Sequence, residues 1–335
     1  MAEKIAIIGA GGWGTALAVL LDENGHKVTL YEYFDKYAAR LEKQRENRKF
    51  LPGVKLKKTV RITASMPKAV NKADIVVLAV PSKFVTVFLE QLKGLKLDKK
   101  TVFLSVIKGL DTDTLERMSE KIFHHLGKNI KLAVLSGPSH AEEVGKKVPT
   151  AVIIASKNAK TAKYLQKVFS SGYFRVYTSR DVLGVELGGA LKNVIAISKG
   201  ILDGMGLGDN TKAALLTRGM AEMKRLAVCM GAKPETLNGL AGFGDLIVTC
   251  MSRHSRNRSV GERIGRGEKL SVIIQSMEMV AEGVTTAEAV YKLARKTKIE
   301  MPIVEETYAV LKKNKNPKAA INNLMNRKLK NEETF

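Results

Sequence analysis

The segment Gly9–Gly14, with the sequence GAGGWG, constrains the fold of this chain more than any other feature. It has the form G-x-G-x-x-G and directly follows the apolar run Lys4–Ile8, which predicts a short buried strand. A helix is expected over Thr15–Leu21, ending at Asn24-Gly25, and the run Lys27–Tyr31 predicts a second strand. Strand, glycine turn, helix and strand in this order predict a dinucleotide-binding unit.

The glycines of this turn have separate expected parts. Gly9 permits the tight turn, Gly11 lets the backbone approach a pyrophosphate, and Gly14 lets the helix pack against the strand. The helix N-terminus then presents free N–H groups and a positive dipole end to the phosphates. The alternative is a glycine-rich turn with a structural part only. Trp13 either flanks the cofactor or packs beneath the loop, and the sequence favours neither.

Glu32 follows the second predicted strand and indicates which cofactor the site prefers. An acidic side chain here accepts hydrogen bonds from the adenosine ribose hydroxyls, which favours NAD. Residues 31–35 contain no arginine for the 2′-phosphate of NADP, and Lys36 and Arg40 are displaced along the chain. We therefore expect NAD as the cofactor, with NADP possible. The alternative is a solvated glutamate at a strand end.

The rest of the first half alternates strand-like and helical segments, which predicts a parallel sheet with right-handed crossovers. From Asp181 onward the pattern is helical, and no strand is expected. The predicted fold is α/β, with a Rossmann-type dinucleotide-binding domain over residues 1–180 and an all-α substrate-binding domain over residues 181–335. The further strands are expected at Ile75–Val80, Thr101–Ile107, Leu132–Leu135, Ala151–Ala155 and Phe174–Thr178, and the main helices at Val185–Lys199, Lys212–Met230, Thr286–Thr297 and Ile303–Lys312.

Composition excludes several classes of protein. The 335 residues are 45% hydrophobic, too apolar for a disordered chain, and only Cys229 and Cys250 occur, so no disulfide framework is expected and a reducing cytoplasm fits. The run Ile5–Leu21 imitates a signal peptide, but its glycines break the apolar region, and no membrane span is expected. The formal net charge is +23, yet the lysines are scattered and no aromatic stacking motif accompanies them, so nucleic-acid binding is not expected.

Two lysines have unusual surroundings. Lys192 lies in an otherwise apolar helical segment, Leu187–Ile197, and Lys108 ends a predicted strand at the edge where open parallel sheets bind ligands. The alternatives are a snorkelling helix lysine and a solvated loop lysine. If the two ammonium groups meet, each disfavours the charge of the other, so we expect a depressed pKa for Lys192.

Other polar residues leave alternatives open. Asp245 sits in a glycine-bounded turn, where it either holds a lysine or substrate hydroxyl or caps the turn. The segment 253–258 (RHSRNR) is the densest basic cluster, and phosphate binding is preferred there over a nucleic-acid patch. Adjacent His124 and His125 point to different helix faces, so no metal site is expected. Met277 and Met279 are expected to be packing residues.

Several motifs together resemble the glycerol-3-phosphate dehydrogenase family, from the first strand to about residue 325. They are Gly11–Ala16 (GGWGTA), Ile107–Gly109 (IKG), Leu135–Ser139 (LSGPS), Gly189–Val194 (GALKNV), Gly208–Ala214 (GDNTKAA), Gly242–Leu246 (GFGDL) and Ser255–Arg258 (SRNR). The resemblance implies hydride transfer between NAD(P)H and dihydroxyacetone phosphate, giving sn-glycerol 3-phosphate for glycerophospholipid synthesis. The alternatives are a non-catalytic NAD(P)-sensing protein and a related two-domain hydroxy-acid dehydrogenase.

The resemblance also assigns residues. It makes Lys192 the general acid and base, brings Lys108 to the substrate beside it, and points to Arg256 and Asn257 for the phosphate, while Arg253 and Arg258 are expected to be solvated. Ser139 stands where some relatives carry asparagine. The substrate contacts are expected from Lys108, Gly137, Ser139, Lys192, Asp245, Thr249, Ser255, Arg256 and Asn257, and the cofactor contacts from Gly9, Gly11, Gly12, Trp13, Gly14, Glu32, Tyr33, Lys108, Ala141, Arg256, Val280 and Glu282. A homodimer is expected.

Overall fold

The computed structural model describes residues 2–329 and 331–332, and this part of the chain forms two compact units. The first unit runs to Ile107 and resumes from Met118 to Val182. The second unit consists of Lys108–Arg117 and the chain from Leu183 onward. The segment Lys108–Arg117 therefore leaves the first unit and returns to it, so no single cut in the sequence separates the two.

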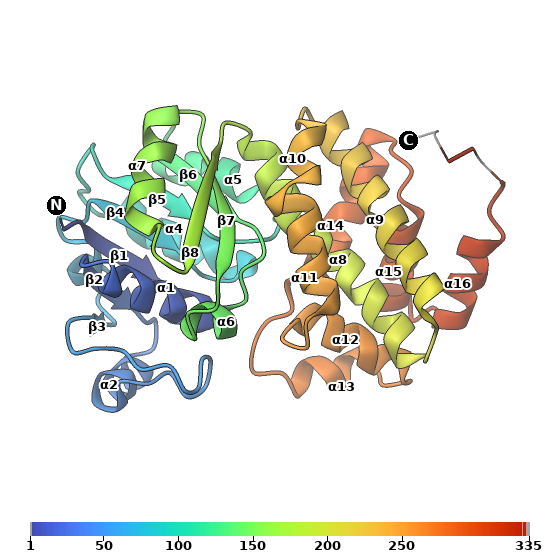
Figure 1. Ribbon diagram of the computed structural model, residues 1–335, viewed down its shortest axis with the longest axis horizontal. Coiled ribbons are helices and arrows are strands. Elements are labelled where there is room, and N and C mark those ends of the chain that lie inside the picture. Colours follow the sequence, from blue (N-terminus) through green and yellow to red (C-terminus); the bar gives the residue numbers. More distant parts are fainter. Residues whose placement is uncertain (1, 330, 333–335) are drawn as a thin grey trace. The chain divides into compact units, whose positions relative to one another are not determined.

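The first unit is built on one sheet of eight strands in the order β3-β2-β1-β4-β5-β6-β7-β8 (Figure 1). All neighbouring strands pair in parallel except β6 and β7, which are antiparallel. The bounds are β1 (Lys4–Ile8), β2 (Lys27–Tyr31), β3 (Arg61–Thr63), β4 (Ile75–Leu78), β5 (Val102–Ser105), β6 (Lys131–Ser136), β7 (Thr150–Ala155) and β8 (Phe174–Ser179). The strand order reverses between β1 and its neighbour β4, so the glycine turn that follows β1 lies at the point where doubly wound sheets bind nucleotides.

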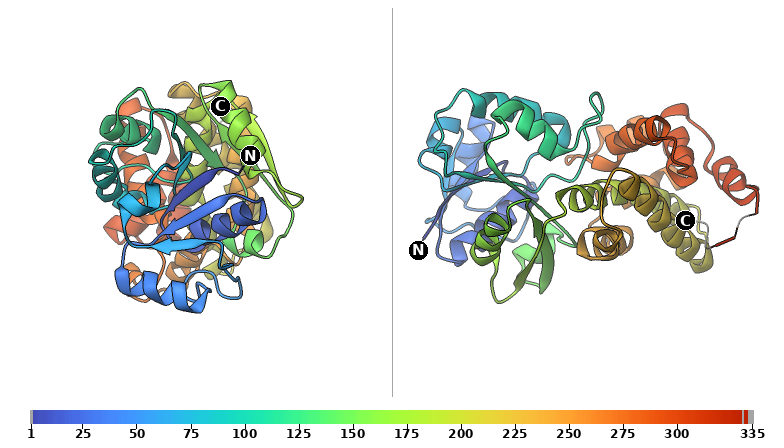
Figure 2. Two further views of the ribbon diagram at one scale, coloured as in Figure 1. Left: turned by 90° about the vertical axis from the view of Figure 1, so that its left-hand side faces the viewer. Right: turned by 90° about the horizontal axis from the view of Figure 1, so that it is seen from above.

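Helices cover both faces of this sheet, as Figure 2 shows. Ile5 and Ile7 pack with α1, α6 and α7, whereas Ala6 and Ile8 pack with α3, α4 and α5, because successive strand residues point to opposite faces. The bounds are α1 (Gly12–Glu23), α2 (Asp35–Gln44), α3 (Met66–Val70), η1 (Ser82–Phe84), α4 (Val85–Lys93), α5 (Met118–Leu126), α6 (Ala141–Gly145) and α7 (Ala159–Phe169).

The predicted strands all occur, and the α/β fold class with a helical second half is confirmed. Two features of the sheet were not predicted. Strand β3 has only three residues and two of them are polar, so it gave no apolar run to recognise. The expectation of a parallel sheet was wrong for β6 and β7, because apolar runs do not reveal strand direction.

The described part of the second unit contains helices and no named strand. The bounds are α8 (Val182–Gly204), α9 (Asp209–Cys229), α10 (Pro234–Asn238), the π-helical turn η2 (Leu240–Gly244), α11 (Asp245–Met251), α12 (Arg256–Gly265), α13 (Leu270–Gln275), α14 (Glu282–Thr297), α15 (Pro302–Lys313) and α16 (Pro317–Met325). None of the helices in the described ranges is long and apolar enough to cross a membrane. The described residues after α16, 326–329 and 331–332, form no helix or strand.

Helix α8 is the core of the second unit, since 19 of its 23 residues are buried. It meets α12 through four glycines. A Cβ on Gly200 or Gly204 would lie 2.0 Å from a carbonyl oxygen of α12, and a Cβ on Gly261 or Gly265 would lie 2.0 or 2.3 Å from one of α8. These distances leave no room for any side chain, so the two helix backbones touch directly.

The segment Lys108–Arg117 belongs to the helical unit because its side chains pack there. Leu110 is buried in the core of that unit, and Leu115 packs against it. Arg117 Nη1 forms an ion pair of 2.6 Å with Glu186 Oε2 on α8. Lys292 on α14 donates to the Thr112 carbonyl oxygen at 3.3 Å. We call this segment the 108–117 arm.

Candidate functional site

The glycine turn of the first unit leaves space where a pyrophosphate is expected. Gly9 has φ +112°, and a Cβ on Gly14 would lie 2.0 Å from the Gly9 carbonyl oxygen. By contrast, no described atom other than its chain neighbours lies within 4 Å of a Cβ built on Gly11. Gly11 is the N-cap of α1 and brings no side chain to its first N–H groups. This cradle therefore fits a nucleotide phosphate.

A residue that sequence reasoning missed holds this turn in place. Asn47 is fully buried, and its Nδ2 donates to the Ala10 carbonyl oxygen at 2.8 Å and to Thr15 Oγ1 at 2.7 Å. Its Oδ1 accepts from the Tyr37 hydroxyl at 2.5 Å. The Phe50 carbonyl lies 2.6 Å from the position of a Cβ on Gly12. A polar residue in an aperiodic segment gave no signal, because only the folded chain brings it to the turn.

Glu32 lies directly after β2, as expected, but it is not solvated. Its side chain is buried, Oε1 accepts the N–H of Phe34 at 3.1 Å, and burial raises its pKa above the usual range. The solvated alternative was therefore wrong. Tyr33 is half exposed and meets the rings of Phe34 and Phe88 edge to face, with centroids 5.1 and 5.7 Å apart.

Trp13 packs within the first unit. Its ring centroid lies 6.4 Å from that of Phe174 on β8, with the planes tilted by 42°. The indole Nε1 is buried and has no hydrogen-bond partner among the described residues. The packing interpretation of Trp13 is thus supported, and a cofactor contact stays a prediction.

The expected substrate loop follows β6 in the first unit. Gly137 has φ +118°, and the Ser139 hydroxyl donates to the Gly137 carbonyl oxygen at 2.8 Å. Ala141 begins α6, and its Cβ lies 3.6 Å from the position of a Cβ on Gly12. The loop and the glycine turn therefore lie close together, although they are more than 120 residues apart in the sequence.

Lys192 and Asp245 form the centre of the site in the second unit. Lys192 is 6% exposed on α8, and its Nζ donates to Asp245 Oδ1 at 2.7 Å and to Thr249 Oγ1 at 2.6 Å. Asp245 was expected in a turn, but it begins α11 immediately after the π-helical turn η2. The four-residue spacing then puts Thr249 on the same helix face as Asp245.

Asp245 bridges two lysines, because Lys108 Nζ lies 2.7 Å from Asp245 Oδ2. The Lys108 side chain is 18% exposed, whereas that of Asp245 is 1% exposed. The Lys108 carbonyl oxygen also accepts from Asn193 Nδ2 at 3.1 Å. The 108–117 arm thus brings the first lysine to the helical unit that holds the second.

The predicted fall in the pKa of Lys192 is confirmed in direction, and the charge of Lys108 contributes to it as expected, but burial, which was not expected, is the larger cause. Burial lowers the pKa of Lys192 to about 8, the Asp245 carboxylate opposes the fall, and the charge of Lys108 makes a smaller contribution to it. Burial alone would raise the pKa of Asp245, yet the two ammonium groups hold that pKa below its usual range. Asp245 therefore stays ionised while Lys192 is poised to exchange a proton near neutral pH.

The basic segment 253–258 opens helix α12, and its residues point in different directions. Ser255 is the N-cap, and its hydroxyl accepts the N–H of Arg258 at 3.2 Å. Asn257 is buried, with its Nδ2 donating to Asn193 Oδ1 and its Oδ1 accepting from Gly283 N–H, both at 2.8 Å. Arg256 is exposed, and its Nη1 donates to the Val280 carbonyl oxygen at 3.1 Å.

The expectation that Arg258 is solvated was wrong. Its Nε lies 2.7 Å from Asp203 Oδ2 on α8, and its Nη1 lies 3.4 Å from Glu262 Oε2. Its place in the first turn of α12 directs the Arg258 side chain toward α8, and the sequence alone did not reveal that this helix face packs on α8. Arg253 is exposed. Glu282 begins α14 and is partly exposed, and Met277 packs on the core of the helical unit, as expected for that methionine.

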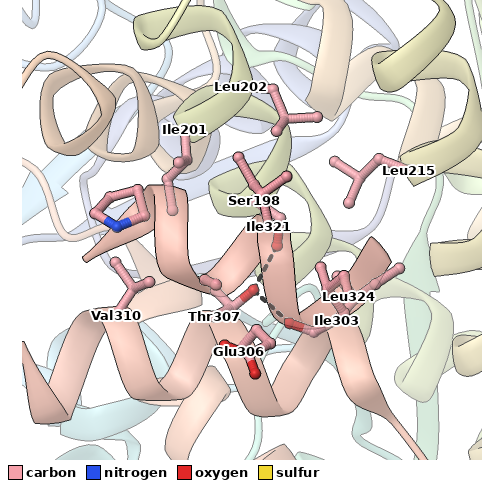
Figure 3. Close-up of a pocket in the computed structure, with 12 residues that line it drawn as sticks. Ser198, Ile201, Leu202, Leu215, Ile303, Glu306, Thr307, Val310, Ile321 and Leu324 are labelled. Carbon is pink, nitrogen blue, oxygen red and sulfur yellow. Dashed lines mark hydrogen bonds between the residues drawn. The ribbon is translucent and has the colours of Figure 1, made fainter. Parts of the chain in front are cut away.

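A separate hollow in the second unit does not belong to this site. It has a volume of about 40 Å³ and is lined mostly by apolar residues of α8, α9, α15 and α16, together with Ser198, Glu306 and Thr307 (Figure 3). Within it, the Ser198 and Thr307 hydroxyls form a hydrogen bond of 2.6 Å, which Figure 3 draws. Ligand pockets usually measure several hundred Å³, so this hollow is too small for a triose phosphate. In the described residues, no group of three His, Cys, Asp or Glu could hold a metal.

Comparison with known proteins decides the family. Residues 4–162 match the model described as NAD-dependent glycerol-3-phosphate dehydrogenase N-terminus, and residues 181–322 match that of the C-terminus. Glycerol-3-phosphate dehydrogenase [NAD(P)+] of Chlorobium limicola is 50% identical over 330 residues, covering 98% of this chain and 99% of the relative. This chain belongs to the NAD-dependent glycerol-3-phosphate dehydrogenase family.

Other members of the glycerol-3-phosphate dehydrogenase family agree in sequence and fold. The Fusobacterium nucleatum relative is 48% identical over 323 residues, covering 96% of both chains. The crystal structure of glycerol-3-phosphate dehydrogenase from Coxiella burnetii has a TM-score of 0.94 at 37% identity, covering 97% of this chain and 99% of that one. D-Mandelate dehydrogenase, at 14% identity and a TM-score of 0.64, shares the fold alone.

Proposed function

We propose that this chain is an NAD(P)-dependent glycerol-3-phosphate dehydrogenase, which interconverts dihydroxyacetone phosphate and sn-glycerol 3-phosphate. The observation that carries the proposal is the pair of lysines bridged by buried Asp245, found in a member of this family. A non-catalytic NAD(P)-sensing protein would have no need of a buried ammonium group with a pKa of about 8.

The chemistry that a bound nicotinamide cofactor supplies is hydride transfer to and from the carbonyl carbon of the substrate. Lys192 protonates the developing alkoxide during ketone reduction and removes the hydroxyl proton in the reverse direction. Lys108 adds positive charge beside that oxygen. Asp245 orients both ammonium groups, and Thr249 fixes Lys192 from a second side.

The substrate phosphate is held from α12. The exposed guanidinium of Arg256 binds the phosphate oxygens, and Asn257 retains one amide N–H beyond the one it gives to Asn193. Gly137, Ser139 and Ser255 complete the proposed substrate contacts. The buried Asn193–Asn257 pair links this grip to the helix that carries Lys192.

The cofactor is held by the glycine turn, with Gly9, Gly11, Gly12, Trp13 and Gly14. Glu32 accepts hydrogen bonds from the ribose hydroxyls, which favours the binding of NAD over that of NADP. Tyr33, Ala141, Val280 and Glu282, together with Lys108 and Arg256, are the remaining proposed contacts. In this proposal residues 1–180 bind the dinucleotide and residues 181–335 bind the substrate, with the 108–117 arm lending Lys108 to the second part.

The cellular setting is part of the same proposal. The product, sn-glycerol 3-phosphate, supplies glycerophospholipid synthesis, and the enzyme works as a homodimer in the cytoplasm. Free Cys229 and Cys250 support a reducing compartment.

The deciding experiment follows the loss of NADH absorbance after dihydroxyacetone phosphate is added to the purified chain. Steady turnover with this substrate is the expected result, and in the oxidative direction no NADH should form from NAD+ and hydroxy acids such as 6-phosphogluconate or 3-hydroxyisobutyrate. Parallel assays with NADPH should give the lower kcat/KM. Absence of turnover with both cofactors would refute the function, whereas a higher kcat/KM with NADPH would refute the part given to Glu32.

A further inference from the structure

A second charged cluster lies at the end of α8, away from the lysine pair. Asp203 Oδ2 lies 2.7 Å from Lys199 Nζ and 2.7 Å from Arg258 Nε, and Asp203 Oδ1 lies 3.7 Å from Lys212 Nζ. The side chains of Asp203 and Lys199 are 9% and 6% exposed. We call these four residues the Asp203 cluster; it joins α8, α9 and α12.

Stability alone is a weak reason for such a cluster. Removing charges from water costs several kcal/mol per ion, and apolar residues of similar size are often as stabilising or better. Buried ion pairs are best known for fixing one arrangement among several. The question is therefore which arrangement the Asp203 cluster fixes.

The arrangement is that of helix α12 against α8. The two helices touch through Gly200 and Gly204 on one side and Gly261 and Gly265 on the other. Helix packing normally fixes its register by setting side-chain ridges into grooves. Glycine faces offer no such ridges at the crossing, so contacts beside it take a larger share in fixing register and rotation.

Two contacts beside the crossing meet this need, and both come from the first turn of α12. Asn257 Nδ2 donates to Asn193 Oδ1 at 2.8 Å, and Arg258 Nε donates to Asp203 Oδ2 at 2.7 Å. They attach α12 to α8 at points ten residues apart along α8, about 15 Å along a helix axis. Arg256 precedes both anchors and points elsewhere, to the Val280 carbonyl.

We propose that Arg258 and Asp203 are positioning residues for the substrate phosphate, because their ion pair fixes the rotation of α12 that aims Arg256. Lys199 and Lys212 hold the Asp203 carboxylate in place for this pair. The proposal rests on the proposed function, in which Arg256 binds the phosphate, and it assigns a part to Lys212 of the GDNTKAA segment. Neither Arg258 nor Asp203 has to touch the substrate.

The test compares two substrates that differ only in the phosphate. Arg258→Met and Asp203→Asn should each lower kcat/KM for dihydroxyacetone phosphate by about 10-fold or more, since small misplacements of a binding group cost up to 10²-fold. The kcat/KM for dihydroxyacetone, which has no phosphate, should change less than about twofold. Arg258→Lys, which keeps the cation, should recover part of the loss.

A double variant separates positioning from general damage. In an Arg256→Ala background, Arg258→Met should lower kcat/KM for dihydroxyacetone phosphate less than about twofold, because the group it aims is gone. The matched control is Arg266→Met, since Arg266 pairs with Glu262 on the same helix and is 63% exposed. This control should behave like the wild type with both substrates.

The outcomes are distinguishable. Equal losses with the two substrates, or an undiminished loss in the Arg256→Ala background, would overturn the positioning role. If Arg258→Met does not fold, as judged by thermal melting and NADH titration, the Asp203→Asn and Arg258→Lys variants decide by the same ratio of the two substrates. A wild-type chain that reduces neither substrate would instead refute the proposed function.

Discussion

Lys192 shows how one residue obtains its chemistry from its surroundings. A lysine on a solvated helix has a pKa near 10.5, whereas burial on α8 brings this one to about 8 in spite of Asp245. Asp245 is therefore needed for geometry and to keep the amine sufficiently protonated, while burial supplies the shift. The two effects act in opposite directions, which makes them separable by mutation.

Replacing Lys192 removes the proposed proton donor. Lys192→Ala should lower kcat for dihydroxyacetone phosphate reduction by about 10²–10⁴, the usual size of a general acid–base contribution. Affinity for NADH, measured by fluorescence titration, should stay nearly unchanged. Wild-type turnover in this variant would reject the assignment.

The charge of Asp245 should influence the pH at which the alkaline limb of the kcat profile occurs. Reduction needs protonated Lys192, so kcat should fall as pH rises through the pKa of about 8. The Asp245 charge raises that pKa, so in Asp245→Asn the limb should move to lower pH, together with a loss of rate. Measuring kcat of the wild type and of Asp245→Asn at roughly half-unit steps from about pH 6 to 10 would show the displacement of the limb. An unmoved limb would contradict the coupling.

The sequence identified most of the chemically active residues but not their partners. Lys108, Lys192 and Asp245 have recognisable local sequence surroundings, Thr249 was assigned by the family resemblance, and the structure brings all four together. The partners of Arg258 and Asn47 could not be predicted, because Asp203 and Ala10 are distant in sequence and no periodicity links them. The family resemblance predicted what these residues do, whereas the structure was needed to show which side chains contact them.

At the scale of elements, helices α8 and α12 cross in direct backbone contact, with glycines in place of packed side chains. Gly261→Ala would put a Cβ 2.0 Å from the Ile197 carbonyl oxygen. We expect a loss of about 1–3 kcal/mol in the free energy of unfolding, the range for overpacked cores, measured by denaturant titration. Gly172→Ala is the control, since a Cβ there meets nothing within 4 Å. Equal effects of the two substitutions would show that the crossing tolerates separation.

Helix α15 begins on a buried carboxylate from α9. Glu222 accepts the N–H groups of Ile303 at 2.7 Å and Val304 at 3.2 Å, and burial raises its pKa to about 7. The folded chain thus holds this proton more tightly than the unfolded chain, in which the pKa is near 4.5. The stability that the protonated group confers is present below pH 4.5 and is lost as pH rises through 7.

Glu222→Gln should flatten this dependence. The melting temperature of the wild type should include a fall between about pH 5 and 8 that the glutamine variant lacks, because an amide does not titrate. Thermal melts of both proteins across that range supply the measurement. Parallel curves for the two proteins would show that Glu222 is not the source.

The positions of helices and strands along the chain were more predictable than the way in which these elements pair and pack. The strand β1, the helix after it and the strand β2 were found because glycine, apolar runs and the Asn24 stop mark them locally. The direction of β7 was not, since antiparallel pairing with β6 is decided by how the chain returns to the sheet. Likewise the π-helical turn before Asp245 depends on Gly242, whose Cβ would lie 2.0 Å from the Leu237 carbonyl oxygen.

At the scale of the whole molecule, the formal net charge of +23 favours anionic ligands. The kcat/KM for dihydroxyacetone phosphate should therefore fall by at least about threefold between low salt and roughly 0.5 M potassium chloride, where charges are screened within a few Å. Uncharged dihydroxyacetone provides the control and should show little change. Identical salt dependence for both substrates would remove the electrostatic explanation.

The 108–117 arm also governs how this enzyme can be recombined. A gene cut near residue 182 would yield a C-terminal fragment without Leu110 in its core and without the ammonium group that faces Asp245 Oδ2. Chimaeras between relatives should therefore take residues 108–117 from the same parent as the helices, as an inserted cassette. The helical unit is thus encoded by two separate stretches of the gene.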